Sequence, residues 1–95
     1  MTREVVNDGA QKRFLLLVDG EQAGLIDYDV TPTGVVDILH TEVDPDKREH
    51  GLASWFVQQV LDGFRASGTR LVAHCPYVQH WLADPTHEEY RALLG

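Results

Sequence analysis

The chain has 95 residues, of which 43% are hydrophobic, and this length predicts one domain spanning residues 1–95 with a small core. A formal net charge of −7 argues against a nucleic-acid-binding protein, because phosphate contacts need clustered lysine and arginine, and it suits a cationic substrate such as an amine. No apolar run is long enough to cross a membrane, and the single cysteine excludes an internal disulfide, which together favour a cytoplasmic protein. The first dozen residues are polar, and we expect them to be loosely held.

The region from residue 13 to residue 43 predicts three antiparallel strands. Arg13–Val18 and Gln22–Val30 are separated by Asp19-Gly20, a dipeptide that closes hairpins because glycine tolerates positive φ. A turn at Thr31–Gly34 precedes the third strand, Val35–Val43. The alternation of this strand predicts one face made of Val36, Ile38, His40 and Glu42.

The pattern then changes to the period of a helix, from Glu49 to Ser67, with Gly68 as its C-cap. Apolar residues spaced three and four apart form one stripe: Leu52, Ala53, Phe56, Val57, Val60, Leu61 and Phe64. Trp55 falls on the polar side, where it is either an isolated exposed aromatic residue or part of a partner surface.

A short strand is predicted at Arg70–His74, and short helices at Tyr77–Ala83 and Glu88–Leu94. A strand, a helix and another strand in succession predict a parallel crossover. The expected fold class is therefore α+β, with a mixed, mostly antiparallel sheet and one β-α-β crossover.

The loop before the long helix has the composition of an anion site. The first N–H groups of a helix lack internal partners and attract negative charge. Gly51 and Ala53 are small enough to let a phosphate approach, and Lys47 and Arg48 add positive charge. The alternative is an ordinary helix entry with two surface cations.

Four short motifs give the chain a family resemblance. They are His40–Val43 (HTEV), Arg48 with Gly51–Ala53 (R-x-x-G-L-A), Cys75–Val78 (CPYV), and His87 with Glu89-Tyr90. Together they resemble the small GCN5-related N-acetyltransferase-like proteins, a minimal form of the acetyl-CoA-dependent acyltransferase fold. Glu49 and His50 depart from that pattern, which usually has glycine after the arginine, and the last motif has two extra residues before His87 and no proline after it.

The resemblance implies a coenzyme A site and an acetyl-transfer centre. It implies that residues 48–53 wrap the pyrophosphate of coenzyme A and that the acetyl group enters beside His40 and Glu42. The implied cofactor-binding residues are Val43, Arg48, Glu49, His50, Gly51, Leu52, Ala53, Ser54 and Tyr77.

Cys75, His40 and Glu42 are the candidates for chemistry. Cys75 ends a parallel strand, with His74 and His80 near it in the sequence and His40 expected near it in space. Its thiol is a nucleophile, an acid that protonates the departing thiolate, or a small buried apolar group. His40 or Glu42 could accept a proton from an ammonium group, or be a core histidine and a solvated carboxylate. No cysteine and histidine spacing predicts a metal site.

Two functions from different classes follow. The first is an acetyl-CoA-dependent N-acetyltransferase acting by direct transfer to a protein lysine, a peptide terminus or a small amine. The second is a non-catalytic coenzyme A-binding or protein-interaction module on the same fold. Glu49 favours the second and the intact HTEV and CPYV motifs favour the first. We expect an amine acceptor as partner, no nucleic acid, no membrane, and a monomer or weak homodimer.

Overall fold

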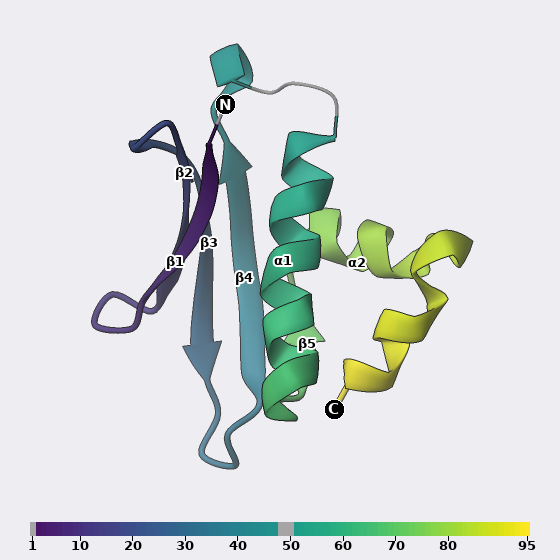
Figure 1. Cartoon of the computed structure of the whole chain (residues 1–95). Coiled ribbons are helices and arrows are strands. Elements are labelled where there is room, and N and C mark those ends of the chain that lie inside the picture. Colours follow the sequence, from purple (N-terminus) through teal and green to yellow (C-terminus); the bar gives the residue numbers. More distant parts are fainter. Residues whose placement is uncertain (1, 48–50) are drawn as a thin grey trace.

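A computed structural model describes residues 2–47 and 51–95. It contains five strands, β1 (Arg3–Asp8), β2 (Arg13–Val18), β3 (Glu21–Val30), β4 (Val36–Val43) and β5 (Leu71–Ala73). The helices are α1 (Leu52–Ser67), α2 (Pro76–Ala83) and the 3₁₀ helices η1 (Pro45–Lys47) and η2 (Pro85–Leu93). Figure 1 shows α1 lying along the sheet, with α2 and η2 beyond β5.

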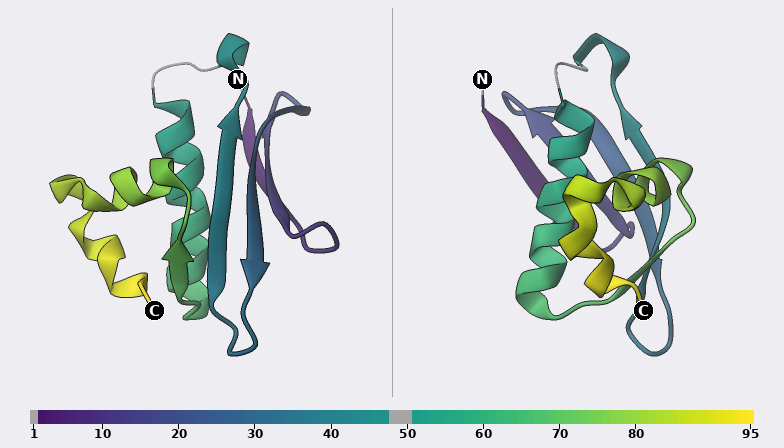
Figure 2. Two further views of the ribbon diagram at one scale, coloured as in Figure 1. Left: turned by 180° about the vertical axis from the view of Figure 1, so that it is seen from behind. Right: turned by 90° about the vertical axis from the view of Figure 1, so that its right-hand side faces the viewer.

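The five strands form one sheet in the order β1-β2-β3-β4-β5. The first four are antiparallel neighbours, and β4 and β5 are parallel, joined by the crossover through α1. The predicted α+β class and mixed, mostly antiparallel sheet are therefore confirmed. The two views in Figure 2 show that α1 covers one side of the sheet, which we call the inner face; the opposite side is the outer face.

Both predicted turns are present. Asp19 and Gly20 have φ values of 51° and 81°, and Gly34 has φ of 87°. Positive φ at both central residues belongs to the type I′ turn, whose twist matches the strands that it joins. These turns fix β2, β3 and β4 as a meander.

The expectation of a loosely held N-terminus is wrong. Residues 3–8 form the edge strand β1, which pairs with β2 from Arg3↔Val18 to Asp8↔Arg13. The side chain of Arg3 lies over the ring of Trp55 at 5.4 Å from its centroid. Trp55 is accordingly half-buried against the core and is not an isolated exposed residue. The strand at residues 3–8 was not predicted because its composition is polar. An edge strand can be polar because it has only one neighbouring strand to pack against.

The face predicted for β4 is also wrong in its second half. Asp27 pairs with His40 and the next residue, Tyr28, pairs with Ile38, so Leu39 is an extra residue in β4. Such a bulge reverses the alternation that follows it. Val36 and Ile38 are buried on the inner face, but His40 and Glu42 are exposed, and Thr41 and Val43 take the inward positions.

The inner face and α1 form the core. Six residues of the predicted helical stripe are buried: Leu52, Phe56, Val57, Val60, Leu61 and Phe64. The helix ends as predicted at Gly68, whose φ is 72° and whose N–H donates to the carbonyl of Phe64. The described helix begins at Leu52, because Gly51 at φ 72° is outside helical geometry.

The C-terminal residues close the β5 side of the molecule. Residues 85–93 form a 3₁₀ helix with a kink at His87, which overlaps the short helix predicted at Glu88–Leu94 and begins three residues earlier. Val78, Trp81, Leu82, Tyr90 and Leu93 join the same core as α1. Leu94 then bridges to Leu71, so the last described residues lie beside β5.

Candidate functional site

A pocket forms where β4 and β5 separate. β5 pairs with β4 only from Val36 to Ile38, after which the chain turns into α2 while β4 continues to Val43. The space between them is a pocket of about 290 Å³. It is lined by β4, the start of α1 and the start of α2, through Thr41, Val43, Gly51, Leu52, Ala53, Ser54 and Tyr77.

The N-terminus of α1 faces this pocket, and among residues 2–47 and 51–95 no side chain caps its first N–H groups. Gly51 makes no side-chain cap hydrogen bond, and the first turn holds no acidic residue. The space at the missing Cβ of Gly51 is clear, with no heavy atom among the described residues within 4 Å. Free helix N–H groups beside an uncrowded glycine are suited to hold phosphate oxygens.

Ser54 ties the first turn of α1 to α2. The indole Nε1 of Trp81 donates to Ser54 Oγ at 2.8 Å. The imidazole of His87 stacks on the Trp81 ring, with 3.6 Å between centroids and 9° between planes, and its Nδ1 lies 2.8 Å from the carbonyl oxygen of Trp81. Trp81, with His87 stacked on its ring, therefore supports one wall of the pocket.

Cys75 reaches the pocket through Thr41. Its side chain is buried, and its Sγ donates to Thr41 Oγ1 at 3.4 Å. Its backbone N–H donates to the carbonyl of Ile38, at the point where the two strands separate. Thr41 lines the pocket, so the thiol stands one hydrogen bond away from it.

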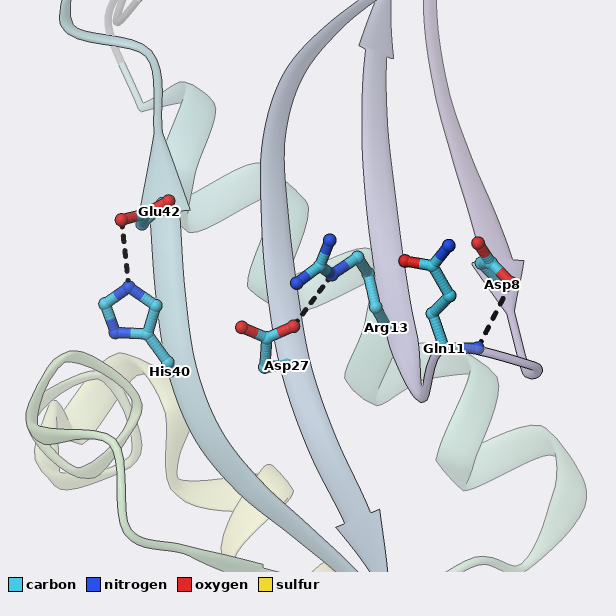
Figure 3. Close-up of polar contacts among 6 residues, drawn as sticks. All are labelled: Asp8, Gln11, Arg13, Asp27, His40 and Glu42. Atoms are coloured by element: carbon cyan, nitrogen blue, oxygen red, sulfur yellow. Dashed lines mark hydrogen bonds and ion pairs between the residues drawn. The ribbon is translucent and has the colours of Figure 1, made fainter.

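His40 and Glu42 lie on the outer face, as Figure 3 shows. His40 Nε2 is 3.1 Å from Glu42 Oε1, and both side chains are more than half exposed. Cys75 is buried against Thr41 on the inner side, so its side chain and that of His40 lie on opposite sides of β4. His74 instead pairs with Asp37, Nδ1 to Oδ1, at 2.6 Å.

A second hollow lies next to the pocket, at the end of β4 and the start of β3. It has a volume of about 480 Å³ and shares Thr41 and Val43 with the pocket. Glu42 and Leu25, which pair across β3 and β4 on the outer face, also line it. Of the three residues predicted to carry chemistry, Glu42 is therefore the one that lines this second hollow.

The remaining predicted residues divide into two groups. Val43, Gly51, Leu52, Ala53, Ser54 and Tyr77 are brought together around the pocket. Arg48, Glu49 and His50 lie outside the described residues. Thr41 and Trp81 were missed: Thr41 because the alternation of β4 placed it outward and no sequence signal marks the bulge, and Trp81 because its bond to Ser54 joins residues far apart in the chain.

Carboxylates set the electrostatics around the sheet. The pKa of Arg13 is raised by its hydrogen bond to Asp27 and by the charge of Asp27, with smaller effects from Asp8 and Glu42.

Within residues 2–47 and 51–95, no group of three His, Cys, Asp or Glu side chains is placed to hold a metal ion. In the same ranges, no helix has the length and apolarity needed to span a bilayer.

A family comparison decides the fold family. Residues 13–93 match the model described as GCN5-related N-acetyl-transferase. The chain belongs to this family. The match starts at β2 and leaves β1 outside it, and among curated proteins none matches the chain.

Solved structures support the GCN5-related N-acetyltransferase fold. Ribosomal-protein-alanine N-acetyltransferase from Brucella melitensis biovar Abortus 2308 has a TM-score of 0.55 and 21% identity, covering 87% of this chain and 62% of its own. The ribosomal-protein-S18-alanine N-acetyltransferase from Escherichia coli has a TM-score of 0.57 and 23% identity, covering 70% and 44%.

N-acetylglutamate synthase from Neisseria gonorrhoeae, complexed with coenzyme A and N-acetyl-glutamate, has a TM-score of 0.58 and 18% identity. This match covers 85% of the present chain and 23% of that enzyme. At these identities the likeness concerns the fold alone. The chain spans less than two thirds of the length of each of these three proteins.

Proposed function

We propose that this chain is an acetyl-CoA-dependent N-acetyltransferase that transfers the acetyl group directly to an amine. The observation that carries the proposal is the pocket between β4, the start of α2 and the N-terminus of α1. Family membership supports the reaction class, and one similar structure is a complex with coenzyme A.

The residues of the pocket fit coenzyme A. The first-turn N–H groups of α1 and the clear space at Gly51 suit a pyrophosphate, and Val43 and Tyr77 provide walls for the pantetheine arm. Arg48, Glu49 and His50 are proposed to complete this loop on the resemblance alone. When bound, acetyl-CoA supplies an activated thioester carbonyl.

The transfer needs a deprotonated amine and a proton for the leaving thiolate. The amine nitrogen bonds to the carbonyl carbon, the carbon–sulfur bond breaks, and the amine loses a proton. Glu42 borders the hollow beside the pocket and is held by His40, so this pair is the proposed proton acceptor, directly or through water. The thiol of Cys75, through Thr41, is the proposed route by which a proton reaches the thiolate.

Burial of Cys75 favours direct transfer over an acetyl-cysteine intermediate. A nucleophilic thiol needs access to the carbonyl carbon, and this one is buried and directed at Thr41. Direct transfer requires only that the amine and the thioester meet in the correct geometry.

The test is an assay of coenzyme A release. The protein is mixed with acetyl-CoA and with lysine amides, peptides with free α-amines or small diamines, and the released thiol is trapped with a chromogenic disulfide. Release that needs both protein and amine, with a mass gain of one acetyl group on the amine, is the expected result. No release with any amine would contradict catalysis.

The second candidate is a coenzyme A-binding module without catalysis, favoured by Glu49. A carboxylate in a loop that holds pyrophosphate repels it. If calorimetry detects coenzyme A binding while no amine is acetylated, this second function replaces the first.

A further inference from the structure

Resting on the proposed function, we infer that the outer face of the sheet docks a lysine-rich protein segment and that this segment supplies the acceptor amine. The substrate class is then a basic polypeptide, recognised over several residues, and not a free small amine.

The outer face is bare and partly apolar. In Figure 3, which looks onto this face, α1 lies behind the sheet, and no helix of the described chain covers β1 to β4 on this side. Cross-strand pairs Val6↔Leu15 and Leu15↔Leu25 align aliphatic side chains across three strands. Val6 and Leu39 are exposed by 36% and 45%, and Leu15, Leu17 and Leu25 are half-buried.

The charge of this face specifies the partner. The strand registers and the contact of Lys12 with Asp29 place six carboxylates and two permanent cations, Lys12 and Arg13, on it. The carboxylates are Glu4, Asp8, Asp27, Asp29, Asp37 and Glu42. Asp29 and Asp27 pair with Lys12 and Arg13, and Asp37 and Glu42 lie beside His74 and His40, so Glu4 and Asp8 on β1 carry the charge that a basic partner would meet most directly. A partner that covers an apolar strip with an acidic border needs interspersed lysines and apolar residues.

The docking face is continuous with the transfer site. Glu42 belongs to the outer face and also lines the hollow that shares Thr41 and Val43 with the pocket. A lysine side chain from a segment lying over β4 therefore enters the hollow beside the proposed base pair. The long stem of lysine can cross the strand while the segment's backbone stays on the face.

The test separates docking from catalysis. Glu4→Gln with Asp8→Asn removes two carboxylates from β1, the strand farthest from the pocket, and asparagine keeps the acceptor that Asp8 offers to the Gln11 N–H. The matched control, Glu88→Gln with Glu89→Gln, removes two exposed carboxylates from η2, away from this face. The probes are a fluorescent peptide of alternating lysine and valine and a single blocked lysine amide.

Binding of the labelled peptide, measured by anisotropy without acetyl-CoA, should weaken about three- to tenfold in the β1 variant and stay unchanged in the η2 control. This difference should shrink at high salt. In the acetyl-transfer assay, kcat/KM should fall by the same factor for the peptide and stay constant for the lysine amide.

Equal loss in both double variants, or no peptide binding to the unaltered protein, would overturn the docking inference. Peptide binding that depends on β1, together with no acetylation of either probe, would support docking and overturn the proposed catalysis. The two failures are thus distinguishable.

Discussion

At the scale of single residues, Cys75 separates two chemical routes. Cys75→Ala should leave part of the acetyl-transfer rate, because direct transfer needs the thiol only as a proton source, and Cys75→Ser should recover some of the loss through its hydroxyl. Rates are measured by thiol release, and the intact mass of the unaltered protein is followed with acetyl-CoA and no amine. A stoichiometric acetyl adduct that discharges to an added amine would establish a covalent route.

Tyr90 links protonation to stability. Its hydroxyl donates to Asp62 Oδ1 at 2.6 Å, and burial, followed by this bond, raises its pKa above the ordinary 10.0. Because the folded pKa exceeds the unfolded one, this stabilisation is complete below pH 10 and is lost as pH rises through the folded value. Tyr90→Phe should lower the free energy of unfolding by about 1 kcal/mol at pH 7.

Urea unfolding at pH 7 and above pH 10 tests this assignment. The gap between the unaltered protein and Tyr90→Phe should narrow at the higher pH, since ionised tyrosine cannot donate. An equal gap at both pH values would mean that lost packing, and not the hydrogen bond, explains the variant.

At the scale of elements, two glycines have opposite roles. A Cβ at Gly24 in β3 would lie 2.6 Å from the Glu42 carbonyl oxygen, whereas at Gly63 in α1 nothing described lies within 4 Å. Gly24→Ala should therefore cost about 1–3 kcal/mol of stability. Gly63→Ala should gain about 0.5–1 kcal/mol, because alanine favours a helix. Thermal unfolding of both variants measures the difference, and a rise in Tm for Gly24→Ala would show that β3 and β4 relax there.

The bond between α2 and α1 should matter for coenzyme A. Trp81→Phe keeps a ring to stack on His87 but removes the donor to Ser54 Oγ, so we expect severalfold weaker coenzyme A binding by calorimetry. Trp55→Phe removes an indole N–H on the side of α1 that faces Arg3, and serves as the control. If the Trp81 variant binds coenzyme A as tightly as the unaltered protein, the hydrogen bond from Trp81 to Ser54 does not contribute to coenzyme A binding.

The elements differed in how well their sequence patterns predicted them. The hairpin glycines and the helical stripe with Gly68 are local signals, and they predicted β2, β3 and α1. The bulge at Leu39 has no local signal, because it depends on how β4 pairs with β3. It moved Thr41 to the pocket and His40 and Glu42 to the outer face, which pattern alternation alone could not show.

At the scale of the whole molecule, the described residues combine one five-stranded sheet with a single face covered by α1. The pocket residues from β4, α1 and α2 were predictable through motifs, since HTEV, G-L-A and CPYV converge where β5 leaves β4. Contacts between distant segments were not predictable, including β1 against Trp55 and Trp81 against Ser54. Each of these contacts depends on tertiary packing, which the hydrophobic periodicity of the sequence does not predict.

The central claim is that coenzyme A binds at the N-terminus of α1 between β4 and α2. Amide chemical shifts recorded by NMR during titration with coenzyme A test this most directly. The largest changes should fall on residues 51–54, Thr41 and Val43, with little change in β1 and η2. Changes that cluster in the β1–β2 hairpin, or no changes at millimolar coenzyme A, would contradict the account.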